Sequence, residues 1–325
     1  MILRLPNRQG LRWSALPLIP GAVPMSYPIQ DLQDKIAKAA VLVEALPYLQ
    51  RFRGQIFVIK MGGSAMEDEE LVRAVMRDVV TLEICGINPV VVHGGGKAIT
   101  AAMARSGLRA EFIDGQRVTD EASIQLVEST LNGEINPGLA SMIRDMGGRS
   151  VGIRGQEVFS AVRTPGRDAQ GKEIDLGYVG RVSDVRAAIV REACREEVVP
   201  VVSPVAADAL GGPIPYNVNA DLAASALARE LRAAKLVYLS DVLGVMRDAK
   251  DPSTLIPSLT PQEVDALIGE GVIHGGMIPK VRSSIEALHA GVGKVHMIDG
   301  RIPHSVLLEV FTDRGIGTEL VSRRD

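Results

Sequence analysis

The stretch VVVHGGGKAI, residues 90–99, runs from three valines through a histidine and three glycines into the start of an apolar pattern. An unbroken apolar run is typical of a strand that is covered on both faces of a parallel sheet. Glycines let backbone N–H groups turn outward, and the following helix adds partial positive charge. The stretch therefore predicts an α/β protein with a candidate anion site at a strand end, although a tight turn without a ligand explains the glycines equally well.

Two familiar nucleotide motifs do not fit this stretch. The phosphate loop GxxxxGK[ST] is absent, and GxGxxG fails because Ile99 stands at its third glycine position. Neither a P-loop nucleotidase nor a dinucleotide-binding oxidoreductase is therefore supported.

Strand and helix patterns alternate on both sides of this stretch, which is typical of a largely parallel sheet with helical crossovers. Residues 147–183 read instead as short strands and hairpins. The pattern predicts one continuous sheet with two lobes that divide near residue 234. Strands are expected over 55–60, 90–93, 198–205 and 294–300, and a strand followed by a turn over 235–246. Helices are expected over 69–85, 97–106, 120–132, 134–146, 183–197, 260–271 and 275–291, and residues 217–232 are expected to start with turn residues and become helical.

The first 29 residues differ from the rest, because their first two dozen include arginines and prolines but no acidic residue. A targeting peptide fits this composition. We favour a disordered segment or a start codon placed too early, since Met25 opens a plausible N-terminus. Apolar residues at helical spacing predict an amphipathic helix over 30–53, and residues 54–325 form the main domain.

The bulk composition excludes several classes of protein. A net charge of -3 without a basic run does not indicate a nucleic-acid binder. No apolar run approaches the roughly 18 residues of a membrane span. The two cysteines, Cys85 and Cys194, have neither metal-ligand spacing nor a disulfide framework, so we expect a cytoplasmic protein and no metal bound directly by the chain.

Two further glycine pairs lie beside lysines. Lys60 ends an apolar strand just before Gly62 and Gly63, and a second pair, Gly275 and Gly276, precedes Lys280. Ligands of doubly wound folds bind at the carboxyl ends of parallel strands. Two lysines there could neutralise charge on a transferring phosphoryl group. The alternative for each lysine is a solvated surface charge, which suits Lys60 less because it follows a buried strand.

Two more polar segments complete the candidate site. Asp221, in NVNAD (217–221), could lie between the two lysines and hold both, while one residue of this segment caps the next helix. Arg117, in GQRVTD (115–120), could clamp a carboxylate with both arms of its guanidinium. It could also be an exposed hairpin arginine, with Thr119 or Asp120 capping the following helix.

Seven segments, in this order, carry a resemblance that covers about residues 30–325: VIKMGGSAM, INPVVVHGGGKAI, FIDGQRVTD, YNVNADLAA, LSDVLGV, GGMIPK and HMIDGRIPHSVLLEVFTDRGIGT. Together they resemble the arginine-sensitive N-acetylglutamate kinases of the amino acid kinase family. The resemblance implies a three-layer α/β/α fold with a mainly parallel central sheet, a substrate lobe over 54–234 and an ATP lobe over 235–325. It also implies transfer of the γ-phosphoryl group from ATP with Mg²⁺ to the side-chain carboxylate of N-acetyl-L-glutamate, in arginine biosynthesis.

The same resemblance assigns roles to individual residues. Lys60 and Lys280 would stabilise the transferring group, and Asp221 would orient both lysines. Arg117 would hold the α-carboxylate of the substrate. The remaining assignments are backbone contacts to phosphate and substrate from Gly62, Gly63, Gly95 and Gly96, a substrate contact from Asn217, and ATP contacts near Ser240, Asp241 and Gly276.

Regulation is implied by both ends of the chain. Arginine-inhibited relatives have an added N-terminal helix that links dimers into a hexamer, a trimer of dimers. In the C-terminal segment, His296, Glu309 and Gly317 fall on the pattern of an arginine site. The plainer alternatives are an ordinary amphipathic helix over 305–311 and a strand residue at 296.

Some features depart from the family pattern and leave the acceptor open. Met61, the pair Asn136-Pro137 and the stretch 155–177 differ from most members, and Pro137 is expected to alter a helix start. A kinase for N-acetyl-aminoadipate, one methylene longer, remains a rival, because a methylene discriminates by only about 1–3 kcal/mol. A non-catalytic regulatory subunit is a further alternative, against which Lys60, Asp221 and Lys280 argue.

Overall fold

The computed structural model describes residues 29–113, 115–167, 171–312 and 315–323, apart from the side chains of residues 29–31 and 64. The predicted segment over 1–29 lies almost wholly outside these residues. Helix α1 spans Ile29–Phe52, where the sequence predicts a helix over 30–53. The chain divides into two compact units, residues 1–44 and 45–325, and the fold described below is that of the second unit.

The centre of the second unit is a mainly parallel sheet. Within the described residues its order is β14-β16-β15-β13-β1-β2-β10-β5, and only the β15–β16 pair is antiparallel. The central strands β1, β2 and β13 are mostly apolar and buried almost throughout, as expected of strands covered on both faces, and their polar residues lie at or near the strand ends. The strands are β1 (Ile56–Met61), β2 (Asn88–His93), β5 (Ser150–Ile153), β10 (Val199–Val202), β13 (Lys235–Ser240), β14 (Ser258–Leu259), β15 (Lys294–Asp299) and β16 (Thr318–Leu320).

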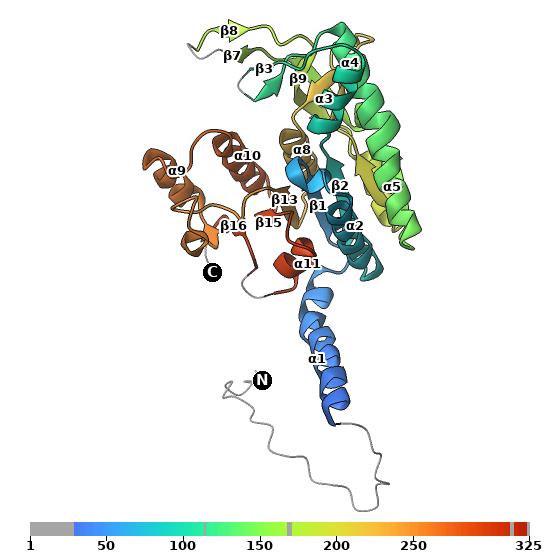
Figure 1. The fold of residues 1–325 in the computed structure, drawn as a ribbon, viewed down its shortest axis with the longest axis vertical. Coiled ribbons are helices and arrows are strands. Elements are labelled where there is room, and N and C mark those ends of the chain that lie inside the picture. Colours follow the sequence, from blue (N-terminus) through green and yellow to red (C-terminus); the bar gives the residue numbers. More distant parts are fainter. Residues whose placement is uncertain (1–28, 114, 168–170, 313–314, 324–325) are drawn as a thin grey trace, which may run out of the picture. The chain divides into compact units, whose positions relative to one another are not determined.

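Helices cover both faces of this sheet and make three layers (Figure 1). One apolar core joins the sheet to α7 (Ala188–Arg195), α8 (Ala220–Leu231), α9 (Pro261–Gly269) and α10 (Met277–His289). A second core joins the other face to α2 (Glu69–Ile84), α5 (Asn136–Asp145) and α11 (Ser305–Val310). The predicted α/β/α fold with a mainly parallel sheet is thereby confirmed.

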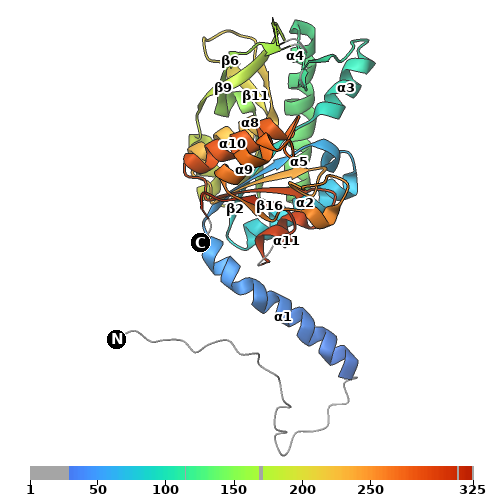
Figure 2. The same ribbon diagram turned by 90° about the vertical axis from the view of Figure 1, so that its left-hand side faces the viewer.

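A small closed barrel forms a separate layer beside α3 (Gly96–Arg105) and α4 (Glu121–Glu128), as Figure 2 shows. Its strands come from the region of predicted short strands and from the segment that follows it. They are β6 (Phe159–Arg163), β9 (Val179–Val185), β11 (Val205–Asp208) and β12 (Tyr216–Val218). Two hairpins, β3 (Phe112–Ile113) with β4 (Gln116–Arg117) and β7 (Gly166–Arg167) with β8 (Glu173–Ile174), accompany the barrel.

Two predicted boundaries are wrong, both because part of the segment belongs to the barrel. The helix expected over 183–197 begins at Ala188, since residues up to Val185 pair with β6. The strand expected over 198–205 is two strands, β10 and β11, separated by Ser203 and Pro204, because proline cannot donate to a ladder. Helix α8 begins at Ala220, after the non-helical residues that the sequence predicts at the start of 217–232, and Asn217 lies in β12.

The chain stays helical from Glu121 to Asp145, although proline at 137 predicts a disturbed helix start. A π-helical segment, Ser129–Ile135, joins α4 to α5 without a break, and Pro137 lies in the first turn of α5. Proline lacks an N–H and its ring conflicts with a regular preceding α-turn. The wider π-turns accommodate it, so the interruption takes the form of a change in helix type.

The start of α9 confirms a cap that the sequence predicts. Thr260 precedes Pro261, and the Thr260 backbone N–H donates to Glu263 Oε2 over 2.8 Å. In return, the Glu263 N–H donates to Thr260 Oγ1 over 3.4 Å. These reciprocal bonds satisfy two backbone donors that a helix start otherwise leaves unpaired.

Candidate active site

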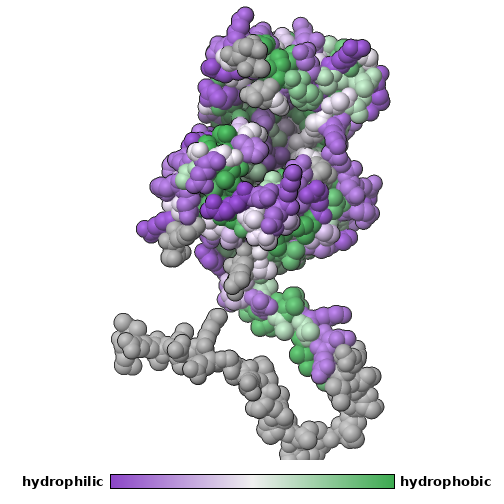
Figure 3. All heavy atoms as spheres, turned by 60° about the vertical axis from the view of Figure 1, so that its left-hand side comes forward, coloured by the Kyte–Doolittle hydropathy of each residue, from purple (hydrophilic) through white to green (hydrophobic). Residues whose placement is uncertain are grey.

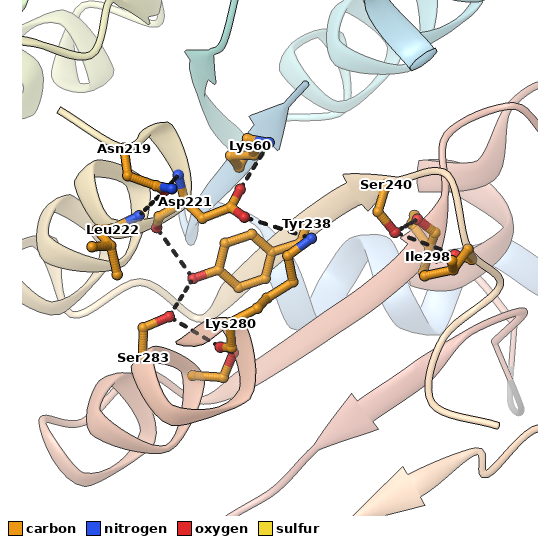
Figure 4. A network of polar contacts seen from close by, with 11 residues as sticks. Lys60, Asn219, Asp221, Leu222, Tyr238, Ser240, Lys280, Ser283 and Ile298 are labelled. Carbon is orange, nitrogen blue, oxygen red and sulfur yellow. Dashed lines mark hydrogen bonds and ion pairs between the residues drawn. The ribbon is translucent and has the colours of Figure 1, made fainter. Parts of the chain in front are cut away.

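Lys60, Asp221 and Lys280 come together at the carboxyl ends of the central strands (Figure 4). Lys60 Nζ lies 2.8 Å from Asp221 Oδ1, and Lys280 Nζ lies 3.5 Å from Asp221 Oδ2. Lys60 is the last residue but one of the buried strand β1 and is only 8% exposed. Asp221 and Lys280 lie in the first turns of α8 and α10. We call these three residues the lysine–aspartate cluster.

The cluster carries one net positive charge, because one carboxylate faces two ammonium groups. Burial alone would raise the pKa of Asp221, but Lys60 and Lys280 outweigh it and hold that pKa below its usual value. The carboxylate is therefore ionised and keeps both lysines pointing at the same region. Such a fixed, partly desolvated positive site suits an anion whose charge develops during a reaction.

Glycine at position 62 is what allows Lys60 to reach the site. A Cβ built on Gly62 would lie 2.2 Å from Lys60 Nζ, so the lysine folds back over a residue that has no side chain. Gly63 follows with a positive φ of 63°. The Gly94 N–H donates to Met61 O over 2.7 Å, which sets the two glycine-rich strand ends side by side.

Arg117 is buried rather than an exposed hairpin arginine. Its Nη2 donates to Gly96 O and to Thr100 Oγ1, each over 2.8 Å, and Nη1 lies 3.2 Å from Met103 Sδ. Its guanidinium also lies 4.6 Å from the centre of the Phe112 ring. No ion pair joins Arg117 to an acidic residue within the described part of the chain, and burial lowers its pKa. A buried guanidinium held in this way is suited to an anionic ligand.

Arg117 lines a cavity of about 180 Å³, which we call the Arg117 cavity. Gly95, Gly96 and Asn217 line it as well, so four of the predicted substrate contacts share one space. A Cβ on Gly95 would lie 2.6 Å from Leu131 Cδ2 and Ile135 Cδ1, so only glycine fits there without displacing the cavity wall. Asn217 Nδ2 donates to Thr119 Oγ1 over 3.4 Å.

Neighbouring polar residues cap the helices α8 and α4. Asn219 caps α8, because its Oδ1 accepts from the N–H groups of Asp221 and Leu222. Asp120 caps α4 by accepting from the Ser123 N–H over 2.8 Å. Asp221 therefore does not cap α8, and its carboxylate pairs with the two lysines instead.

The predicted nucleotide contacts lie in the second half of the sheet. Ser240 ends β13, and its hydroxyl donates to the carbonyls of Val242 and Ile298 rather than to the lysine–aspartate cluster (Figure 4). Asp241 is exposed, and Gly276 directly precedes α10. Within the described residues, no hydrogen bond joins these three residues to one another or to the lysine–aspartate cluster.

A larger cavity, about 840 Å³, lies at the opposite edge of the sheet, where β1, β13 and β15 begin. His296, Glu309 and Lys235 line it, and we call it the amino-edge cavity. His296 Nδ1 lies 2.6 Å from Glu309 Oε1, and His296 Nε2 lies 2.8 Å from Lys235 Nζ. Gly317 donates its N–H to Glu309 Oε2 over 3.1 Å. The three predicted arginine-site residues are therefore joined in one network.

The protonation of this network follows from its contacts. Burial, and then the Lys235 ammonium, lower the pKa of His296, so the ring is neutral. It donates from Nδ1 to Glu309 and accepts at Nε2 from Lys235. Burial also lowers the pKa of Lys235 to about 8, and the ammonium of Lys294 adds to this effect.

Three polar residues of these sites were not singled out from the sequence. Lys235 opens an apolar strand, a placement that could have drawn attention to it. Tyr238 lies within the same strand and contacts the lysine–aspartate cluster. His93 is fully buried behind the glycines, and burial lowers its pKa to about 4, so it is neutral. It bonds to Gly94 O through Nδ1 over 2.9 Å and supports the loop.

Comparison with known proteins gives one consistent family. The model described as "Amino acid kinase family" matches residues 55–299. The chain is 56% identical over 286 residues to the acetylglutamate kinase of Akkermansia muciniphila, covering 88% of this chain and 96% of the relative. It is 47% identical over 293 residues to that of Heliobacterium modesticaldum, covering 87% and 97%.

Solved structures extend the likeness. The N-acetylglutamate synthase of Neisseria gonorrhoeae, complexed with coenzyme A and N-acetyl-glutamate, matches with a TM-score of 0.75 at 26% identity over 88% of this chain. This chain spans only 64% of the synthase. The same synthase complexed with coenzyme A and L-arginine matches with a TM-score of 0.71 at 25% identity, covering 88% of this chain and 65% of the synthase.

Proposed function

The chain belongs to the amino acid kinase family, among its acetylglutamate kinases, and on this premise we propose that it phosphorylates the side-chain carboxylate of N-acetyl-L-glutamate with ATP. The product is N-acetyl-L-glutamyl 5-phosphate, in arginine biosynthesis. The observation that carries the proposal is the lysine–aspartate cluster on the same sheet edge as the glycine-rich loop that borders the Arg117 cavity. We place the reaction in the cytoplasm, where two unpaired cysteines stay reduced.

The proposed reaction needs no nucleophile from the protein, which contributes by positioning the substrates and stabilising charge. A carboxylate oxygen of the acceptor forms the new P–O bond while the bond from the γ-phosphorus to the β–γ bridging oxygen breaks, and ADP leaves. Lys60 and Lys280 stabilise the charge on the transferring group, and Asp221 keeps both in place. Backbone N–H groups of Gly62 and Gly63 add donors. Mg²⁺ enters with the nucleotide as part of the second substrate.

The Arg117 cavity supplies the acceptor site. Arg117 pairs with the α-carboxylate of N-acetylglutamate, and Asn217, Gly95 and Gly96 hold the rest of the molecule. The nucleotide lies toward Ser240, Asp241 and Gly276, on the side of Lys280. The residues 54–234 and 235–325 then act as substrate and ATP lobes.

Trapping the acyl phosphate with hydroxylamine tests this function. ATP, Mg²⁺ and N-acetylglutamate are expected to yield a hydroxamate, and N-acetyl-aminoadipate is expected to yield much less. If only N-acetyl-aminoadipate gave hydroxamate, the reaction type would stand but the proposed substrate would be wrong. If no acyl-amino acid gave hydroxamate, the kinase proposal would be wrong and a regulatory subunit would be favoured. A fluorescence titration with NADH tests the oxidoreductase alternative separately.

The amino-edge cavity favours feedback inhibition by arginine as a second role. It offers Glu309 and Glu319 as carboxylates for a guanidinium, and its volume of about 840 Å³ is in the range of a ligand site. The synthase neighbour that is complexed with L-arginine shares this fold. Glu309 accepts N–H bonds from Ile316 and Gly317 and pairs with His296, so its position in the cavity wall is fixed. Burial alone would raise its pKa, but the pairing with His296 and these bonds outweigh burial and lower that pKa, so the carboxylate is charged and attracts a cation.

Replacing Glu309 by glutamine is expected to raise the arginine concentration for half-inhibition at least about tenfold. The amide keeps the shape but loses the charge that pairs with the guanidinium. The measurement is hydroxamate formation against arginine concentration, with each variant's own uninhibited rate as reference. Glu286, an exposed acid on α10, supplies the control. Arginine should inhibit the Glu286→Gln variant at the same concentrations as the wild type. An unchanged inhibition curve for Glu309→Gln would place the effector elsewhere.

We further propose a hexamer built as a trimer of dimers. Helix α1 exposes Leu32, Ile36, Val41, Leu42 and Val43, and Figure 3 shows apolar side chains gathered along it. Such a cluster is unusual on a monomer. Within the described residues, β5 pairs only with β10 and leaves one edge of the sheet free for a second copy.

Native mass spectrometry checks the assembly. The full chain is expected at six copies, and the double variant Ile36→Asp with Leu42→Asp is expected at two, because buried charge on α1 opposes the contact between dimers. Wild-type chain at two copies would contradict the proposed role of α1.

A further inference from the structure

Tyr238 occupies a special position beside the lysine–aspartate cluster. It is fully buried in the middle of β13, and its backbone is the register partner of Lys60 in the parallel β1–β13 pair. Asp221 and Lys280 come from α8 and α10, which pack against each other on the same face of the sheet. One aromatic side chain therefore lies among the three elements that carry the cluster, as Figure 4 shows.

The Tyr238 hydroxyl reaches both helices. It donates toward Asp221 O at 3.4 Å and lies 3.5 Å from Ser283 Oγ. Ser283 in turn donates to Lys280 O over 3.0 Å. Burial raises the pKa of the phenol, so it remains protonated and able to donate. The hydroxyl thus ties the start of α8 to the turn of α10 that carries Lys280.

The Tyr238 ring lies near the ammonium of Lys280, which is farther from the Asp221 carboxylate than that of Lys60. Lys280 Nζ lies 5.9 Å from the ring centre and 3.5 Å from Asp221, whereas Lys60 Nζ lies 2.8 Å from Asp221. The face of an aromatic ring attracts a cation. Because the two lysines repel each other and share one carboxylate, Lys280 needs a second contact to keep its place.

We propose that Tyr238 is a positioning residue for phosphoryl transfer, which holds Lys280 through its ring and the Asp221 backbone through its hydroxyl. The inference rests on the proposed kinase reaction and adds a residue to it. Because Tyr238 is fully buried, its effect passes through the separation and direction of the two lysines. A misplacement of about 1 Å at such a site can lower a rate roughly 100-fold.

Two substitutions separate the ring from the hydroxyl. Tyr238→Leu is expected to lower kcat about 10- to 100-fold, with KM for ATP and for N-acetylglutamate within about twofold of wild type. Tyr238→Phe keeps the ring beside Lys280 and should recover most of the lost kcat. Phe159→Leu is the matched control, because it removes a fully buried ring from the same apolar core but away from the cluster. It should lose thermal stability and keep kcat.

The affinity for a transition-state analogue distinguishes a positioning role of Tyr238 from a purely structural one. ADP with aluminium fluoride and N-acetylglutamate places a planar anion where the phosphoryl group passes between the lysines. Calorimetry is expected to show Tyr238→Leu losing at least about tenfold in affinity for this complex and less than about twofold for ADP alone. Equal losses for both ligands would overturn the positioning role.

The outcomes distinguish this inference from the function on which it rests. Wild-type enzyme that phosphorylates no acceptor overturns the proposed function. Active wild type, together with Tyr238→Leu turning over at the rate of Phe159→Leu, overturns the role of Tyr238 alone.

Discussion

Enzyme with Lys280 replaced by alanine is expected to retain less than about one hundredth of the wild-type kcat. Removing one preorganised stabiliser of a transition-state charge typically costs about 100- to 1000-fold. Here the loss also takes the net charge of the lysine–aspartate cluster from positive to neutral, since Asp221 would then be matched by Lys60 alone. Single-turnover hydroxamate formation at saturating ATP and N-acetylglutamate measures the effect on the chemical step.

Lys250→Ala supplies the control, because Lys250 is an exposed lysine in the loop after β13. Its kcat should equal that of wild type. Binding of ADP to Lys280→Ala should change far less than kcat, since the lysine acts mainly on the moving phosphoryl group. A Lys280→Ala enzyme with more than a tenth of the wild-type kcat would remove this lysine from the reaction.

Arg117→Lys is expected to raise KM for N-acetylglutamate by about 10- to 100-fold while kcat changes only a few-fold. Lysine keeps the charge but cannot reproduce the fork that Gly96 O and Thr100 Oγ1 hold in place. A contact made equally in the ground state and in the transition state appears in KM rather than in kcat. Initial rates at saturating ATP, as a function of acceptor concentration, give both constants.

An acceptor analogue identifies the group that Arg117 binds. N-acetylglutamate with its α-carboxylate converted to an amide still offers the reacting side-chain carboxylate. Wild type should discriminate strongly against the amide, and Arg117→Lys should discriminate much less. If the substitution weakened both acceptors equally, the partner of Arg117 would not be the α-carboxylate.

The arrangement of the sheet and the core of the site could be predicted because they depend on local signals. The apolar strand before Lys60 and the glycines after it indicate a buried lysine at a strand end, and Gly62 proves to be the residue under its ammonium. The Thr260 cap depends on only four consecutive residues. Such features can be predicted from sequence because the interacting residues are close neighbours in the chain.

The remaining features depend on register between distant segments. Tyr238 matters because it pairs with Lys60 across strands and reaches α8 and α10, which lie on either side of it in the sequence. Lys235 becomes a cavity residue through His296, which comes 61 positions later. The late start of α7 has the same origin, since pairing of Val185 with Phe159 outweighs helical periodicity there. Periodicity within one segment cannot reveal such partners.

Strand β13 begins at the amino-edge cavity with Lys235 and ends with Ser240 at the carboxyl edge of the sheet. At about 3.3 Å per residue, its ends lie roughly 16 Å apart. A compound seated against His296 and Glu309 and a nucleotide beside Lys280 thus occupy no atom in common. Such a compound would act on phosphoryl transfer only through the strands and helices that lie between the two positions. An inhibitor designed for the amino-edge cavity therefore needs no resemblance to a nucleotide, because the groups it meets are His296, Glu309 and Lys235.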